Sequence, residues 1–188
     1  MGTRSLIAVY MDGEYKIAQY SQWDGDPEGQ GCKCLCFLTE KMVEHQFRKR
    51  LKSLRTIQSQ EQLEAIKSTY KPFIDFPEFN RNTGADILWL VQEFKTTTGC
   101  VINRLDFAIG KDDAFACDWA WVIDLDKRTF EAYEGYNKKP LQPGDRFWFL
   151  EGLSYGGYHP VKLVAKWSLS NLPEEKEFLE TFKKEDET

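Results

Sequence analysis

The chain has 188 residues with a formal net charge of −5, and 41% of its residues are hydrophobic. This length fits one domain, and 13 Phe, 8 Tyr and 6 Trp supply enough bulky apolar surface to exclude global disorder. The acidic balance argues against nucleic acid as a partner, because phosphate binding requires a dominant basic face. We expect a single globular domain over residues 1–188, with residues 183–188 as a frayed, charged tail.

Cysteine usage and apolar run lengths bear on location. The cysteine count of five is odd, and Cys32, Cys34 and Cys36 lie within five residues, which suits reduced thiols better than a disulfide framework. Apolar runs stay well below the roughly 18–20 residues of a membrane span, and the N-terminus lacks the apolar region of a signal peptide. The sequence therefore predicts a cytoplasmic protein with no membrane partner.

The first 31 residues predict a β-hairpin followed by a loop. Residues Arg4–Tyr10 and Tyr15–Gln22 have strand character, and Asp12-Gly13 between them is a turn dipeptide that tolerates positive φ. Residues Asp24–Gly31 hold three Gly and one Pro, which disfavour both strand and helix interiors. We expect this stretch to be a loop.

The middle third predicts helices. An apolar stripe at helical spacing runs over residues 42–54, Ser59 with Gln62 forms a capping-box pattern for a helix through Ile66, and a third helix begins near Thr83 and ends at Gly99. The members of the stripe are Met42, Val43, Phe47, Leu51 and Leu54.

The last part of the chain predicts strands and a closing helix. A turn at Asp124–Arg128 joins two of the strands, and a helix follows from about Leu172. Strands at both ends with helices between them indicate an α+β fold, with a mainly antiparallel sheet formed by the N-terminal hairpin and the C-terminal strands and a central helical segment packed on one face. The expected strands are Val101–Phe107, Trp119–Asp124, Thr129–Glu134, Arg146–Leu150 and Pro160–Trp167.

Three short stretches carry a family resemblance: Met1-Gly2-Thr3-Arg4, Asp12-Gly13-Glu14-Tyr15-Lys16, and Ala18 to Gly25 with Gln22-Trp23-Asp24-Gly25 at its end. Together they resemble an uncharacterised family of hypothetical fungal proteins and, more distantly, bacterial or phage ones. The resemblance implies no activity. In that family a Tyr stands where this chain has Asp26, and residue 28 is often not acidic, which weakens any mechanism that requires Asp26 or Glu28.

The spacing of Asp24, Asp26 and Glu28 before Gly29 matches the first half of a calcium loop. The match fails at Leu35, where a bidentate Glu is required, and a strand rather than a helix precedes the loop. A solvated acidic turn is the simpler interpretation, so we expect no metal and no other cofactor. Phosphate binding by the glycines is disfavoured because the three carboxylates repel an anion.

Nucleophilic catalysis has few possible arrangements here. The chain has two histidines, His45 and His159, and His159 could act as the base for a thiolate of Cys100 or Cys117 only if the fold brings them together. Buried, inert cysteines are the commoner outcome. An N-terminal nucleophile would require removal of two residues to free Thr3.

Two surface features allow other interpretations. A basic run on the helix over residues 42–54 could contact an acidic partner, although a solvated helical face explains it equally. Trp23 and the tyrosines of the Gly-rich segment near residue 156 could stack on a ring, whereas the other tryptophans fit core positions in strands.

These patterns favour a binding or interaction module that presents residues 22–31 to an unknown small ligand or protein. The residues expected to contact that ligand are Arg4, Gln22, Trp23, Asp24 and Glu28. The alternative is a small hydrolase with Asp24 or Glu28 as general base, which needs an acid and an oxyanion donor that the sequence does not identify.

Overall fold

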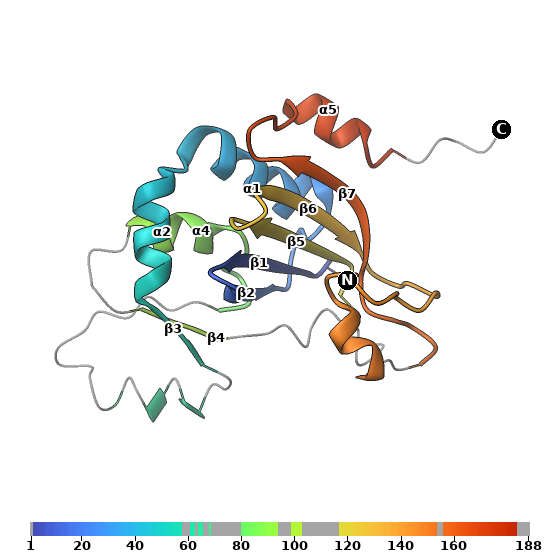
Figure 1. The fold of residues 1–188 in the computed structure, drawn as a ribbon, viewed down its shortest axis with the longest axis horizontal. Coiled ribbons are helices and arrows are strands. Elements are labelled where there is room, and N and C mark those ends of the chain that lie inside the picture. The colour runs from blue at the N-terminus through green and yellow to red at the C-terminus, as the bar shows by residue number, and fades with distance from the viewer. Residues whose placement is uncertain are drawn as a thin grey trace.

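The computed structural model describes residues 2–57, 61–62, 64–65, 68, 80–93, 99–102, 117–153 and 156–183 (Figure 1). Its centre is a five-stranded sheet of order β2-β1-β5-β6-β7. Neighbouring strands are antiparallel except β1 and β5, which run parallel. The predicted α+β class is confirmed, because the N-terminal hairpin joins the later strands in one mainly antiparallel sheet. The strands are β1 (Ser5–Met11), β2 (Glu14–Ser21), β5 (Trp119–Asp124), β6 (Thr129–Glu134) and β7 (Lys162–Ser168).

The hairpin between β1 and β2 turns over two residues, as the sequence predicts. Asp12 and Gly13 have φ values of 55° and 79°, and Met11 pairs with Glu14 directly across the turn. This double positive φ fits the twist of the strands. The carboxylate of Asp126 accepts the backbone N–H groups of Asp12 and Gly13 at 3.0 Å each, which fastens the hairpin to the turn between β5 and β6.

The predicted loop at Asp24–Gly31 is wrong for its second half, which is helical. Pro27–Gly31 forms a π-helical turn, η1, that continues into α1 (Cys32–Cys36) and η2 (Phe37–Lys41). Asp26 caps this helix, since its Oδ1 accepts the Gly29 N–H at 2.8 Å, and Pro27 occupies the first turn, where its missing N–H costs nothing. At this position the helix-capping contact stabilises the helix by more than the glycines destabilise it.

The remaining helices are α2 (Glu44–Ser53), α4 (Asp86–Glu93) and α5 (Glu175–Glu180), with a 3₁₀ helix, η4, at Trp148–Leu153. The strand predicted at Arg146–Leu150 is therefore wrong. Helix α2 stops before Leu54, where β3 (Leu54–Ile57) begins and pairs in parallel with β4 (Gly99–Ile102). Helices α4 and α5 begin about three residues later than predicted.

Several predictions fall wholly or partly outside the described residues. They concern the helix over residues 59–66, of which residues 61–62 and 64–65 are described and helical, the end of the helix at 94–98, the strand portion at 103–107, and residues 184–188 of the tail. Within the described part of the chain, no helix is long and apolar enough to cross a lipid bilayer.

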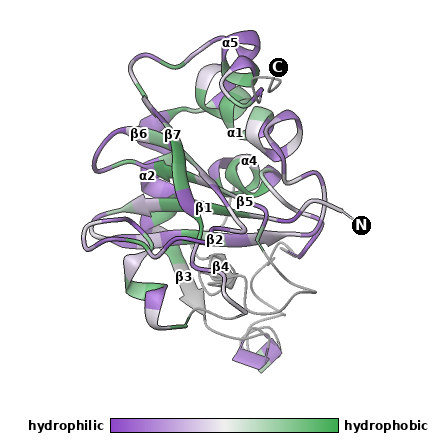
Figure 2. Cartoon of the chain, turned by 90° about the vertical axis from the view of Figure 1, so that its right-hand side faces the viewer, coloured by the Kyte–Doolittle hydropathy of each residue, from purple (hydrophilic) through white to green (hydrophobic). Residues whose placement is uncertain are grey.

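Two buried apolar clusters use alternate residues of the same strands. The first combines Ile7, Trp121 and Phe130 of the sheet with side chains of α1, η2, α2, α4 and α5. The second combines Leu6, Val122 and Tyr133 with residues of the segment 141–161. In Figure 2 hydrophobic colouring runs through the central strands and the neighbouring helices, whereas the turns are hydrophilic.

Candidate functional site

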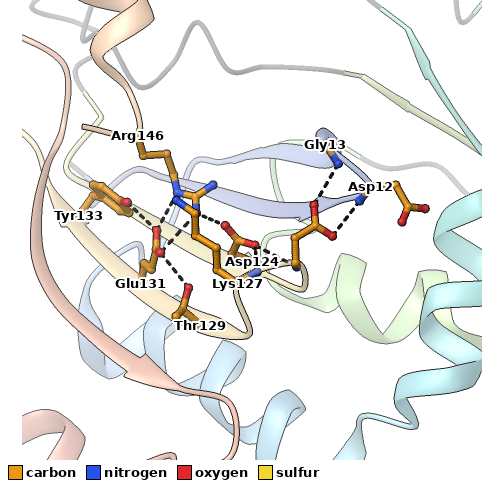
Figure 3. A network of polar contacts seen from close by, with 9 residues as sticks. Asp12, Gly13, Asp124, Lys127, Thr129, Glu131, Tyr133 and Arg146 are labelled. Atoms are coloured by element: carbon orange, nitrogen blue, oxygen red, sulfur yellow. Dashed lines mark hydrogen bonds and ion pairs between the residues drawn. The ribbon is translucent and has the colours of Figure 1, made fainter. Parts of the chain in front are cut away.

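Three charged side chains are buried together on the sheet face that carries the second cluster. Arg146 Nε donates to Glu131 Oε2 at 2.7 Å, and Arg146 Nη2 pairs with the Asp124 carboxylate (Figure 3). The exposed fractions of these side chains are 10% for Arg146, 5% for Glu131 and 0% for Asp124. The guanidinium also lies over the Tyr10 ring, 5.4 Å from its centroid, which adds a cation–π contact.

The local sequence explains how each member is positioned. In β6, Phe130 and Ala132 pack in the first cluster, so strand alternation turns Glu131 and Tyr133 to the opposite face. Asp124 ends β5 at the turn, where its Oδ1 accepts the N–H groups of Asp126 at 3.0 Å and Lys127 at 2.7 Å. The two carboxylates thus come from neighbouring strands, and Arg146 reaches both.

Hydrogen bonds shift the pKa values of Glu131 and Arg146 toward their charged forms. Burial alone would raise the pKa of Glu131, but the hydrogen bonds from Arg146 and Tyr133 together hold that pKa below its usual value. Tyr133 donates to Glu131 Oε2 at 2.6 Å, and Thr129 donates to Oε1 at 2.8 Å. Burial alone would lower the pKa of Arg146, but the bonds to Glu131 and Asp124 have the larger effect and raise that pKa above its usual value. The Glu131–Arg146 pair is therefore stabilised in its charged form.

A hollow of about 760 Å³ opens beside these residues, and we call it the Arg146 hollow. This volume lies within the roughly 300–1,000 Å³ range of small-molecule sites. Phe149, one of its lining residues, is 54% exposed. Its lining combines the network, several aromatic rings and four lysines: Tyr10, Tyr15, Tyr133, Phe147, Phe149, Lys127, Lys139, Lys162 and Lys166.

Two of the sequence-predicted site residues, Arg4 and Gln22, form hydrogen bonds to distant parts of the chain or to neighbouring side chains. Arg4 is 3% exposed, its backbone N–H donates to Asp118 Oδ2 at 2.6 Å, and its Nε lies 3.6 Å from the same oxygen. Gln22 accepts the Tyr20 hydroxyl at 2.6 Å and donates its backbone N–H to the Arg81 carbonyl at 2.9 Å. These contacts anchor the N-terminal segment and the end of β2.

The other three predicted residues are exposed. Trp23 is 50% exposed and covers Gly2, where an added Cβ would lie 2.2 Å from the indole ring. Asp24 has a φ of 53°, and its carbonyl accepts the Gln30 N–H at 2.6 Å. Glu28 is exposed on η1. Of the predicted set, these three side chains are exposed, Gln22 is half-buried and Arg4 is buried.

Asp24 and Glu28 border a second hollow of about 720 Å³, which we call the loop hollow. Asp26, Asp86 and Glu175 add carboxylates to its lining, and the buried Phe37 and the 44% exposed Trp89 are its aromatic residues. Within the described residues, no three His, Cys, Asp or Glu side chains are arranged to hold a metal ion. Since Asp26 already caps η1, the calcium interpretation gains no support.

The geometry also gives no support to a Cys–His pair. Burial raises the pKa of the Cys32 thiol to about 11 and that of Cys117 to about 12, so both stay protonated at neutral pH. Cys117 Sγ donates to the Trp119 carbonyl at 3.0 Å, and the His159 ring contacts the Glu151 carboxylate. The side chain of Cys100 lies outside the described part of the chain.

Sequence reasoning missed the Arg146 hollow. One signal was available: Glu131 stands in the middle of a strand whose neighbours are Phe130 and Ala132, and a charged residue at such a position needs a buried partner or solvent. Its partner could not be identified from sequence, because Arg146 lies in a segment with strand-like composition.

No protein-family model matches the chain, and comparisons with curated proteins and with solved structures likewise give no match. The resemblance of the first 31 residues to hypothetical fungal proteins therefore stays a prediction.

Proposed function

We propose that the protein is a binding module and that a small organic ligand occupies the Arg146 hollow. The observation that carries this proposal is a buried ion-pair network at the wall of a hollow of ligand size. Polar groups fixed by their own hydrogen bonds and surrounded by aromatic rings are characteristic of small-molecule sites, as are titratable groups with perturbed pKa values. Free thiols at Cys32, Cys34 and Cys36 support a proposed location in the cytoplasm.

Binding is better supported than hydrolysis. A general base should have a pKa near the working pH, whereas hydrogen bonds hold the Glu131 pKa below its usual value. The hydrolase alternative places Asp24 or Glu28 as base at the loop hollow, where the nearby Cys32 thiol is held protonated. If residues 22–31 bind a ligand, as the sequence predicts, the loop hollow is the site that they line.

A fragment screen by ligand-observed NMR, repeated on three variants, tests the proposal. Phe149→Ala removes a lining ring of the Arg146 hollow, and Trp148→Ala is the matched control, because Trp148 is 46% exposed on the same 3₁₀ turn but does not line the hollow. Trp89→Ala changes the loop hollow. We expect the screen to find fragments that bind the unmodified protein, Trp148→Ala and Trp89→Ala but do not bind Phe149→Ala.

Two results would contradict the proposal. Fragments lost in Trp89→Ala but kept in Phe149→Ala would place the site at the loop hollow and restore the original expectation for residues 22–31. A screen without any fragment sensitive to Phe149→Ala would refute binding in the Arg146 hollow.

A further inference from the structure

We infer that the ligand of the Arg146 hollow is a small organic anion with a flat apolar body, an inference that rests on the proposed function. Lys127, Lys139, Lys162 and Lys166 come from the β5–β6 turn, the segment after β6, and β7, yet all four line this hollow. All four are exposed, and none forms an ion pair with a carboxylate in the described part of the chain.

The carboxylates that line the hollow are already engaged. Asp124 and Glu131 share Arg146, and Asp145 Oδ2 accepts the Gln142 N–H at 2.7 Å. Strand alternation from Leu163 turns Lys162 to the other face of β7, so Arg146, Lys127, Lys139 and Lys166 are the cationic groups set against three carboxylates, although the chain as a whole carries 25 Lys and Arg against 30 Asp and Glu. An entering anion meets ammonium groups that form no ion pair in the described residues, whereas an entering cation meets two buried carboxylates that are already paired with Arg146 and one exposed carboxylate, Asp145.

A bulge in β7 places a lysine and an apolar residue on the same side. The register shifts between Ala132 and Tyr133, so that Lys166 stands opposite Glu131 and Leu163 opposite Tyr133. Residues directly opposite each other in an antiparallel pair share a face, so both side chains face the hollow despite being three positions apart. Leu163 is 41% exposed there, and Tyr10, Tyr15 and Phe149 add aromatic rings.

These observations define the chemistry of the ligand. Rings and Leu163 favour a flat apolar body, and the exposed ammonium groups favour a negatively charged head. Lysine acts as a point charge without the planar fork of arginine, so a carboxylate and a phosphate are both suitable heads. The shared chemistry is an aromatic organic anion.

A matched set of naphthyl compounds tests this inference. Naphthoate and naphthyl phosphate carry the two anionic heads, naphthamide is the neutral analogue, and naphthylmethylammonium is the cationic one. We expect at least one anion to bind ten or more times more tightly than the amide in titrations followed by NMR, with the cation weakest. The advantage should shrink between about 50 mM and about 300 mM salt, because exposed charges are screened.

Two double variants with the same change in net charge assign the effect to the hollow. Lys139→Gln/Lys166→Gln removes two of its ammonium groups, and Lys33→Gln/Lys41→Gln removes two that line the loop hollow. We expect the first to lower naphthoate affinity about tenfold and to leave naphthamide affinity unchanged, at a cost of about 1.4 kcal/mol. We expect the control pair to leave both affinities unchanged.

The outcomes separate this inference from the proposed function. If naphthamide binds within about twofold of both anions, or if the control pair lowers naphthoate affinity equally, the ligand is not selected by these lysines and the inference is overturned. In that case Phe149-dependent binding of fragments would still support the proposed function. If neither the naphthyl compounds nor any fragment depends on Phe149, both fail.

Discussion

Replacement of Arg146 by Met removes the one cation that Asp124 and Glu131 share and keeps most of the packing volume. Both carboxylates are buried, with side-chain exposures of 0% and 5%. Breaking a buried ion pair from one side costs about 3–5 kcal/mol, because a charge is left without compensation. Here two charges lose their partner at once, which favours the upper part of this range.

The remaining hydrogen bonds oppose that loss. Glu131 keeps the hydroxyl groups of Tyr133 and Thr129, and Asp124 keeps two backbone N–H groups of the turn. Because each carboxylate stays partly satisfied, we expect Arg146→Met to lower the free energy of unfolding by about 3 kcal/mol at neutral pH.

The pH dependence gives this prediction a second signature. In the native protein the pKa of Glu131 is below its usual value, so the carboxylate contributes stability that is present at neutral pH and lost as the pH falls through its folded-state pKa. Without Arg146, burial acts with less opposition and raises the pKa of Glu131, so the charged carboxylate destabilises the variant. The difference in the free energy of unfolding between the two proteins should therefore narrow as the pH falls from about 7 to about 5.

Urea denaturation followed by tryptophan fluorescence measures both effects. Arg128→Met is the matched control, because Arg128 is 50% exposed and its Nη1 donates to Glu44 Oε1 at 2.8 Å. We expect this exposed pair to contribute about 0–1 kcal/mol. A loss below about 1 kcal/mol for Arg146→Met, or a gap that stays constant with pH, would refute the reasoning.

Three further predictions concern the segment from Asp24 to Cys32. Gly29→Ala should destabilise the protein by at least about 2 kcal/mol, because the added Cβ would lie 2.1 Å from the Asp24 carbonyl oxygen, and an unchanged urea midpoint would contradict this. Gln30→Ala should lower the free energy of unfolding by about 2 kcal/mol in the same assay, because the buried amide accepts the Ala85 N–H at 2.7 Å. The control Asp24→Asn changes an exposed side chain and should alter the free energy of unfolding by less than about 0.5 kcal/mol. Equal losses in the two variants would count against a structural role for Gln30. Alkylation of Cys32, followed by mass spectrometry, should speed up roughly tenfold per pH unit from about pH 7 and level off near pH 11, whereas levelling below pH 9 would show an activated thiol.

Local signals account for what the sequence predicted well. The two-residue Asp12-Gly13 turn fixes the hairpin through its positive φ values, and the strands at Trp119–Asp124 and Thr129–Glu134 begin and end as predicted. Each of these features depends on neighbours a few residues away. The glycine-rich stretch before Cys32 predicted a loop, but Asp26 as the cap and Pro27 in the first turn begin a helix there.

Long-range contacts account for what the sequence did not predict. Strands β3 and β4 pair across more than 40 residues, and no local pattern names the partner of a parallel strand. The aromatic run after Arg146 has strand-like composition, but the Trp148 N–H donates to the Asp145 carbonyl at 3.1 Å and begins a 3₁₀ turn instead. The Arg146 hollow is equally non-local, because its lining spans residues 10–166.

The parallel pairing of β1 with β5 means that the sheet can be completed only late in the synthesis of the protein. Arg4 bonds to Asp118, 114 residues later, so the inner edge of β1 has no strand partner until the ribosome has made β5. At about 5–20 residues per second, these 114 residues take roughly 6–23 s. During that time Leu6, Ile7, Ala8 and Val9, all fully buried in the folded protein, lack the layer that covers them. Until β5 is made, β1 is thus paired along one edge, by β2, and its other edge is open to wrong pairing.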